Sequence, residues 1–376
     1  MKKECDVLVV GAGPAGSMSA KIAAEGGLDV INIEKDEKIG SPVRCAEAIN
    51  KDAFQDTGIP SEKSFINQEI DGTKIYFYNE EYFFSGEKWR GFTLDRKIFD
   101  KYLSDIASEK GANIYTGATA KGLEFRGDRI KVKVGRDNKN FDISTKIVIG
   151  ADGFEANVGR WANIRKPWKQ GEYAVAYELL VSGVKIKENN YWHVFFGEEF
   201  PSGYGWVFPK GKNTANIGVA VAPGNNLKKA LVFLIQKYLP LHKIIGREYT
   251  IEEIRGGGIP TCGPLPARNT IGNGIILVGD SAGIVEPITG EGIVPSMLSG
   301  IAAGETSINA IRQGKWKKKN LLMYRKCWEE KRYIGAKLGE DLESTTKIKD
   351  DFYRAFSDRK VDKAVRSEWA EKIRSL

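Results

Sequence analysis

The sequence predicts an α/β fold in which a parallel sheet is interrupted by a β-rich insertion and followed by a helical C-terminal segment. Three observations support this prediction. A short apolar run at residues 5–10 leads directly into a glycine-rich turn and a helix, which is typical of a buried parallel strand. Longer strand-like runs fill residues 172–260. An apolar strand at residues 274–280 and a small-residue helix then resume the first pattern.

The elements follow in a clear order along the chain. The first half is expected to hold a βαβ unit, an aromatic hairpin, an amphipathic helix, a third parallel strand and short alternating strands. These elements occupy residues 5–10, 15–25, 29–34, 74–84, 95–109, 112–115 and 121–149. The second half is expected to hold four strands and a helix, and later another helix, at residues 173–181, 191–196, 204–209, 214–222, 227–238 and 294–312. The last 60 or so residues read as helical and charged.

Composition excludes several classes of protein. The 376 residues carry a formal net charge of +8, which suits anionic headgroups but does not indicate a nucleic-acid partner. The four cysteines form no CxxC pair and the two histidines lie far apart, so we expect no metal site and reduced, cytoplasmic thiols. No apolar window reaches the roughly 20 residues that a membrane-spanning helix needs. Any membrane contact is therefore expected to be peripheral, on the inner face of the cell membrane.

The first chemical motif is the glycine loop Gly11-x-Gly13-x-x-Gly16 between a strand and a helix. Gly11 permits the tight turn, Gly13 lets a pyrophosphate approach the backbone, and Gly16 allows close packing of helix on strand. Glu34 ends the next strand, 18 residues after Gly16, where an acid accepts hydrogen bonds from ribose hydroxyls. The motif predicts a Rossmann-like dinucleotide site but does not separate NAD from FAD.

Later segments separate the two cofactors. Residues 149–153, with Asp152 and Gly153, resemble the second nucleotide motif of flavin hydroxylases, and residues 277–283 resemble the third, in which the aspartate binds the ribityl chain. Asp280 holds that position here, although an isolated aspartate there would read as a helix cap. Arg96 follows Asp95 at the start of a predicted helix and completes the set. The ordered motifs indicate FAD.

A glycine-rich loop at residues 286–293 precedes the helix at 294–312. Free N–H groups and the positive end of the helix dipole would face the flavin from this loop, through Gly290 and Gly292. Such an arrangement stabilises an anionic reduced flavin.

From about residue 4 to at least residue 330, the chain resembles the geranylgeranyl reductase family of FAD proteins, and especially its archaeal branch. Segments 40–47, 203–211, 216–218 and 287–293 carry the resemblance, and the Tyr-x-Trp-x-Phe-Pro-Lys-Gly run from Tyr204 discriminates best. The family often has glycines after its cysteine, whereas this chain has Cys-Ala-Glu-Ala from Cys45. The resemblance implies the glutathione-reductase or p-hydroxybenzoate-hydroxylase type of fold. It also implies saturation of isoprenoid chains in membrane-lipid precursors by hydride from reduced FAD.

The motifs and the resemblance together imply a set of site residues. The residues expected to contact FAD are Gly11, Gly13, Pro14, Ala15, Gly16, Glu34, Lys35, Arg44, Cys45, Ala46, Ala48, Arg96, Ala120, Asp152, Gly153, Asp280, Gly290, Gly292 and Ile293. The residues expected to contact substrate are Tyr204, Trp206, Phe208 and Pro209. Cys45, Tyr204 and Trp206 are the expected catalytic residues, beside a flavin that carries most of the chemistry.

The division into domains follows from these assignments. We expect a discontinuous FAD-binding domain at 1–70, 95–165 and 263–312, a β-rich substrate domain at 71–94 and 166–262, and a C-terminal helical region at 313–376.

The aromatic content of residues 173–208 agrees with a prenylated lipid substrate. Ten of these 36 residues are aromatic, against 10% for the whole chain, and an apolar tunnel needs such a lining. Tyr204, Trp206 and Phe208 share one strand face, which could equally belong to a sheet core. The basic and aromatic segments 315–319 and 324–328 suit docking on an anionic membrane, or a solvated helix face.

Some alternatives stay open at the level of sequence. A flavin monooxygenase or halogenase shares the fold and the first motifs, and a non-catalytic flavin electron carrier is a third reading. No second GxGxxG motif is present, so the reductant is expected to be external, either ferredoxin or NADPH. No residue stands out as the proton donor; water and Cys45 are both conceivable.

Overall fold

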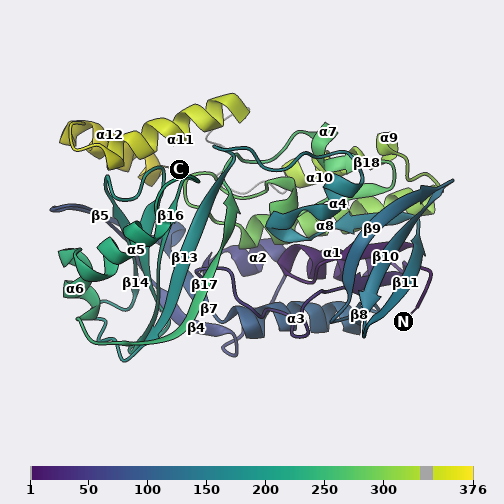
Figure 1. Cartoon of the computed structure of the whole chain (residues 1–376), viewed down its shortest axis with the longest axis horizontal. Coiled ribbons are helices and arrows are strands. Elements are labelled where there is room, and N and C mark those ends of the chain that lie inside the picture. Colours follow the sequence, from purple (N-terminus) through teal and green to yellow (C-terminus); the bar gives the residue numbers. More distant parts are fainter. Residues whose placement is uncertain (1, 331–341, 376) are drawn as a thin grey trace.

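The computed structural model describes residues 2–330 and 342–375 and has two sheet-based halves along its longest axis (Figure 1). One half contains the N-terminal strand and the long helices, and the other half contains the longest strands. The C-terminal helices α11 (Leu342–Ser357) and α12 (Lys363–Ser375) lie over the second half. No helix in the described part of the chain is long and apolar enough to cross a bilayer.

The first half is built on a six-stranded sheet with five parallel strands. Its order is β18-β19-β12-β1-β2-β8, and only β18 runs antiparallel. The strands are β1 (Val7–Val10), β2 (Val30–Ile33), β8 (Asn113–Tyr115), β12 (Ile147–Gly150), β18 (Ile271–Gly272) and β19 (Ile275–Leu277).

Both faces of this sheet are covered, which explains why its strands read as continuous apolar runs. Val7 and Val9 face helices α1 (Pro14–Glu25) and α8 (Ile293–Arg312), with α3 (Arg96–Glu109) beside α1. Leu8 and Val10 face a three-stranded sheet. Its strands are β9 (Thr119–Arg126), β10 (Arg129–Arg136) and β11 (Lys139–Thr145).

The second half is a seven-stranded sheet in the order β17-β13-β16-β15-β14-β5-β6, antiparallel except where β14 pairs with β5. The strands are β5 (Gly72–Phe77), β6 (Glu80–Ser85), β13 (Tyr173–Ser182), β14 (Tyr191–Phe196), β15 (Tyr204–Pro209), β16 (Thr214–Val221) and β17 (Thr250–Pro260). One face packs under helices α5 (Leu227–Gln236) and α6 (Leu239–Ile245). The opposite face of the seven-stranded sheet faces the first half and carries Trp206 and Phe208.

Short elements connect the halves. A three-stranded sheet joins β3 (Ala48–Asn50), β7 (Gly91–Leu94) and β4 (Ile66–Ile70). The remaining elements are α2 (Ala53–Thr57), α4 (Asn157–Trp161), α7 (Ala267–Thr270), α9 (Lys318–Leu321), α10 (Met323–Glu330) and the 3₁₀ turns η1 (Glu87–Trp89), η2 (Gly153–Glu155) and η3 (Gly279–Ala282). The division into domains stays a prediction, and part of its C-terminal region lies outside the described residues.

Two expectations in the β-rich region were incomplete. Strand β17 was missed because Gly256-Gly257-Gly258 has low strand propensity, yet it pairs with β13 along its length. The helix expected at residues 227–238 ends at Gln236, and a second helix starts at Leu239 with a proline in its first turn. Proline suits that position because the N–H it lacks would have no partner there.

The two described aromatic side chains of segment 315–328 contribute to the packing of the first half. Trp316 packs against the core of the first half, and Tyr324 is 3% exposed within it. The side chain of Trp328 lies outside the described residues. Membrane docking through this segment stays a prediction, and Tyr324 does not contribute to it because its side chain belongs to the core.

Candidate active site

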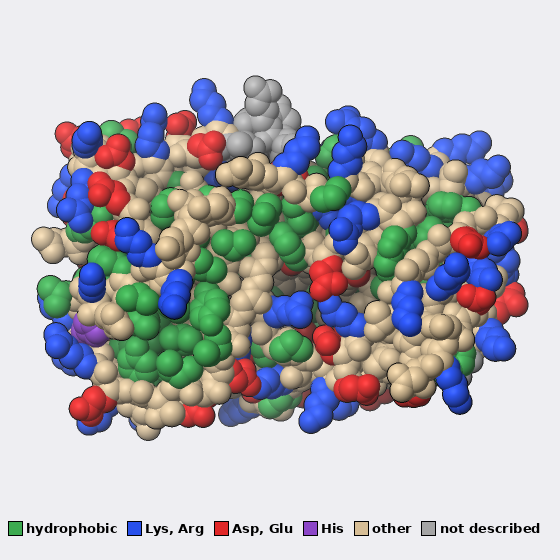
Figure 2. All heavy atoms as spheres, in the orientation of Figure 1, with side chains coloured by type: hydrophobic (Ala, Val, Ile, Leu, Met, Phe, Trp, Pro, Cys, Tyr) green, Lys and Arg blue, Asp and Glu red, His purple; other side chains and the backbone are tan. Residues whose placement is uncertain are grey.

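A cavity of about 880 Å³ lies between the two halves. Its walls come from the carboxyl ends of β1, β2 and β12, the loop at 40–48, the loop at 285–292 and the inner face of the seven-stranded sheet. Figure 2 shows a hollow near the middle of the molecular surface in view, with charged side chains around it. Ligands of open α/β sheets bind at this edge, where the strands end.

The glycine loop has the geometry that its sequence predicts. Gly11 has φ +103°, and a Cβ there would lie 2.2 Å from the carbonyl oxygen of Ala151. A Cβ at Gly16 would lie 1.9 Å from the oxygen of Gly11, so Gly16 serves the packing of α1 on β1 and does not line the cavity. Gly13 has open space where a Cβ would stand, and no side chain caps the start of α1. The free N–H groups of α1 can therefore receive a pyrophosphate.

Three carboxylates line the nucleotide side of the cavity. Glu34 accepts hydrogen bonds from the backbone N–H groups of Ala12 at 2.8 Å and Asp36 at 3.1 Å. Asp152 Oδ2 accepts from Val158 N at 2.8 Å, while its buried Oδ1 has no hydrogen-bond partner among the described residues. Burial raises the pKa of Asp152 and of Asp280 to about 6 each. Buried acceptors with unused capacity fit a ligand rich in hydroxyl groups, as FAD is.

The loop at 285–292 is held by three side chains. Glu286 Oε2 accepts from Ile288 N at 2.9 Å and Thr289 N at 2.6 Å. Tyr204 Oη donates to the carbonyl oxygen of Thr289, and Tyr353 Oη of α11 donates to that of Ile288 at 2.9 Å. The loop ends at the start of α8, whose first N–H groups have no side-chain cap. It is therefore a fixed donor surface at the flavin end of the predicted site.

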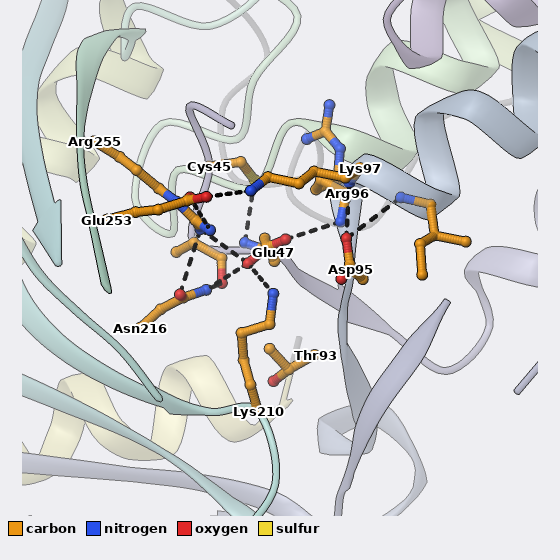
Figure 3. Close-up of polar contacts among 12 residues, drawn as sticks. Cys45, Glu47, Thr93, Asp95, Arg96, Lys97, Lys210, Asn216, Glu253 and Arg255 are labelled. Carbon is orange, nitrogen blue, oxygen red and sulfur yellow. Dashed lines mark hydrogen bonds and ion pairs between the residues drawn. The ribbon is translucent and has the colours of Figure 1, made fainter. Parts of the chain in front are cut away.

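The loop at 40–48 is fixed by a buried ion cluster around Glu47, which sequence reasoning did not assign to the site (Figure 3). Glu47 has φ +70° and is fully buried. Its carboxylate accepts from Arg96 N at 2.8 Å, Asn216 Nδ2 at 2.8 Å, Arg255 Nη1 at 3.0 Å and the ammonium of Lys210. Burial opposes its ionisation, but these donors outweigh burial and hold the pKa of Glu47 below its usual range.

Cys45 lies two residues before Glu47 in the same wall. Its Sγ accepts from Glu47 N at 3.2 Å, and burial raises the pKa of its thiol. Cys45 is therefore a neutral thiol at neutral pH. Arg96, which also lines the cavity, is paired with Asp100 through Nε at 2.6 Å and Nη2 at 2.8 Å.

The inner face of the seven-stranded sheet forms an aromatic wall. Ring centroids lie 5.8 Å apart for Tyr204 and Trp206, 6.2 Å for Trp206 and Phe208, and 5.8 Å for Phe208 and Trp192. The i, i+2 spacing on β15 places Tyr204, Trp206 and Phe208 on one face, as expected. All three line the cavity, whereas Pro209 does not.

The structure brings together nearly all of the predicted FAD residues in this one cavity. Of that set only Gly16 is absent from the lining. Sequence reasoning missed Glu47, Glu178 and Arg255, which also line it. A signal existed for Glu178, since it is the only charge in the otherwise apolar run of β13.

Comparisons with known proteins agree with the assignment of this cavity as an FAD site. Residues 4–326 match the FAD binding domain family. The digeranylgeranylglycerophospholipid reductase of Methanothrix thermoacetophila is 36% identical over 99% of this chain and 93% of its own length. Those of Methanocaldococcus jannaschii and Methanosarcina acetivorans are 37% and 38% identical, over 87% and 94% of this chain and 83% and 86% of their own lengths.

Solved structures show the same relationship. A geranylgeranyl bacteriochlorophyll reductase-like protein from Thermoplasma acidophilum superposes with a TM-score of 0.81 at 29% identity, over 97% of this chain and 95% of that one. A flavin-dependent brominase and a halogenase, at 16% and 15% identity with TM-scores of 0.71 and 0.73, share the fold. The predictions of an FAD-dependent oxidoreductase and of this fold class are confirmed. The chain belongs to the digeranylgeranylglycerophospholipid reductase family of FAD proteins.

Proposed function

We propose that this protein saturates C=C bonds in the geranylgeranyl chains of archaeal ether-lipid precursors. The observation that carries this proposal is the aromatic wall Tyr204–Trp206–Phe208, which extends the cavity beyond its nucleotide end. An isoprenoid chain gains roughly 0.8 kcal/mol for each CH₂ that it buries on such a surface. Family membership supports the same substrate class.

The residues that line the cavity have distinct proposed roles. FAD, when bound, supplies the hydride. The N–H groups of α1 hold the pyrophosphate, Glu34 and Asp280 accept from the ribose and ribityl hydroxyls, and the donor surface at 285–292 faces the isoalloxazine. Trp206 and Phe208 exclude water and hold the alkene against the flavin.

The electron donor and the membrane contact belong to the same proposal. The chain has no second dinucleotide motif, so the donor is an external one, reduced ferredoxin or NADPH. A lipid substrate is collected by peripheral contact at the cytoplasmic face of the membrane. Ile251 and Ile254 of β17 are 48% and 61% exposed, and Leu239 of α6 is 62% exposed, all in the second half. These exposed apolar side chains support contact through that half.

A direct experiment tests the reaction. Dithionite-reduced protein is incubated anaerobically with digeranylgeranylglycerophospholipid, and the lipid is analysed by mass spectrometry. We expect a mass gain of two hydrogens for each bond reduced, together with reoxidation of the flavin. An unchanged lipid mass would contradict the proposed function. Lipid-dependent oxygen consumption without saturation would instead support a monooxygenase of the same fold.

A further inference from the structure

Saturating an alkene requires a proton as well as a hydride, and one side chain of the cavity wall has the properties of a proton donor. Glu178 is 4% exposed, lines the cavity and belongs to β13. Its Oε2 accepts from Trp206 Nε1 at 3.0 Å and its Oε1 from Arg255 Nη1 at 3.2 Å. We propose that Glu178 is the acid that protonates the alkene, a role that rests on the proposed reduction.

Strand register builds this arrangement. Gly218 of β16 pairs with both Trp206 on β15 and Glu178 on β13, and Glu178 pairs with Arg255 on β17. These residues form one row across four strands, and Gly218 contributes no side chain to it. A Cβ at Gly218 would lie 2.2 Å from Trp206 Cζ2, so the indole lies across the bare backbone and reaches Glu178. Trp206 thus both walls the cavity and holds the carboxyl in place.

The hydrogen-bond donors are unevenly shared between the buried carboxyl groups of Glu47 and Glu178. Glu47 receives four donors, including the ammonium of Lys210. Glu178 receives two, and one of them is the Arg255 nitrogen that lies closer to Glu47. The rest of the Arg255 guanidinium is paired with Glu253, at 2.9 Å from Nε and 2.8 Å from Nη2. Of the two buried carboxyls, Glu178 is therefore the one that retains a proton.

The titration of Glu178 agrees with this geometry. Burial, the largest influence, and the Glu47 carboxylate raise its pKa to about 8, against the opposing effect of Arg255. Charged and titratable groups approach it from β17, the loop at 40–48, the segment after β15 and α3. Arg255, Glu47 and Cys45 interact with Glu178 itself. Lys210, Glu253, Arg96 and Asp100 belong to the same cluster through their contacts with Glu47, Arg255 or Arg96.

The step balances without a further reactant. The O–H bond of Glu178 breaks and its proton forms a C–H bond at one alkene carbon, while hydride from reduced FAD forms the C–H bond at the other. The π bond is lost, and the two electrons that the alkene gains are those of the hydride that reduced FAD would supply when bound. The Glu178 carboxylate then regains a proton from water before the next turnover.

The test compares Glu178→Gln with wild-type holoenzyme. Glutamine keeps an oxygen acceptor for Trp206 Nε1 but carries no acidic proton. Glu188→Gln is the matched control, because Glu188 lies outside the cavity lining and pairs with Lys74 near the same sheet. FAD content, flavin absorbance and reduction by dithionite are measured first in all three proteins. Single-turnover reoxidation by the geranylgeranyl lipid is then followed anaerobically from pH 6 to 9.

We expect wild type and Glu188→Gln to lose rate above about pH 8, where Glu178 ionises. Glu178→Gln should retain FAD, react roughly 10²- to 10⁴-fold more slowly and lack the pH break. Unchanged rate and pH break in Glu178→Gln would overturn the role of Glu178. Failure of the wild type to react with the lipid would instead overturn the proposed function.

Infrared spectroscopy gives a readout that does not depend on turnover. Wild-type protein should show the C=O stretch of a protonated carboxyl that disappears as pH rises through about 8. The band should be absent in Glu178→Gln and shifted in Glu178→Asp. If Glu178→Gln fails to hold FAD, this titration of wild type and Glu178→Asp decides the matter. A protonated band that neither titrates there nor moves in Glu178→Asp counts against the proposal.

Discussion

Replacing Glu47 by glutamine should strongly destabilise the protein. The substitution removes the negative charge that compensates the buried side chains of Lys210 and Arg255, which are 5% and 4% exposed. It also puts an amide N–H₂ group in the place of one carboxylate oxygen, where it faces either Arg96 N or the three donors on Oε2. Removing one partner of a buried ion pair costs about 3–5 kcal/mol. Since native proteins are stable by only about 5–15 kcal/mol, we expect a large loss of folded holoenzyme.

Urea titration at pH 7, followed by tryptophan and flavin fluorescence, measures this cost. The double variant Glu47→Gln/Lys210→Met removes one uncompensated cation together with the carboxylate, so its loss should be smaller than the sum of the two single losses. The folded-state pKa of Glu47 is lowered, so its contribution is present above its unfolded pKa and is lost as pH falls through the folded value. A loss below about 1 kcal/mol, or strict additivity in the cycle, would refute the reasoning.

Three further substitutions test the nucleotide and flavin ends of the cavity. Gly11→Ala places a Cβ 2.2 Å from the oxygen of Ala151 at φ +103°, so we expect the purified protein to lack flavin absorbance. Tyr204→Phe removes the hydrogen bond to Thr289 O, and the Kd for FAD, measured by fluorescence titration, should rise up to about tenfold. The raised pKa of Asp152 favours the protonated folded form, so wild-type apoprotein should lose about 3 kcal/mol of stability as pH rises from about 4 to 6. Asp152→Asn cannot ionise and should not show this loss. The difference between the urea titrations of the two apoproteins across that range checks the last expectation.

The parts of the site that depend on local backbone chemistry were predictable from sequence. Gly11 and Gly16 must be glycines because a Cβ at either position would collide with the neighbouring backbone, and that requirement is visible in the spacing alone. The alternation in β15 likewise predicted that Tyr204, Trp206 and Phe208 share a face. Whether that face was core or cavity could not be predicted, because the answer depends on what covers it.

The parts that depend on distant pairing were not predictable. Glu47 and Arg255 are 208 residues apart in sequence and meet at 3.0 Å only because β17 pairs with β13. β17 itself was missed, so neither the cluster nor the row through Glu178 could have been assembled. The available signal was the lone carboxylate of Glu178 in an apolar strand, which by itself does not identify the residues that pair with it.

The row across β15, β16, β13 and β17 limits how this sheet can change during evolution. Side chains alternate between the cavity and the helices α5 and α6, so inserting one residue within β13 would turn those beyond it to the opposite face. A carboxylate in the position of Glu178 would then lie under a helix, and an aliphatic neighbour would face the substrate. Length changes are therefore compatible with the active site only in the turns between strands. In relatives, we expect insertions to concentrate there and the paired segments to keep their lengths.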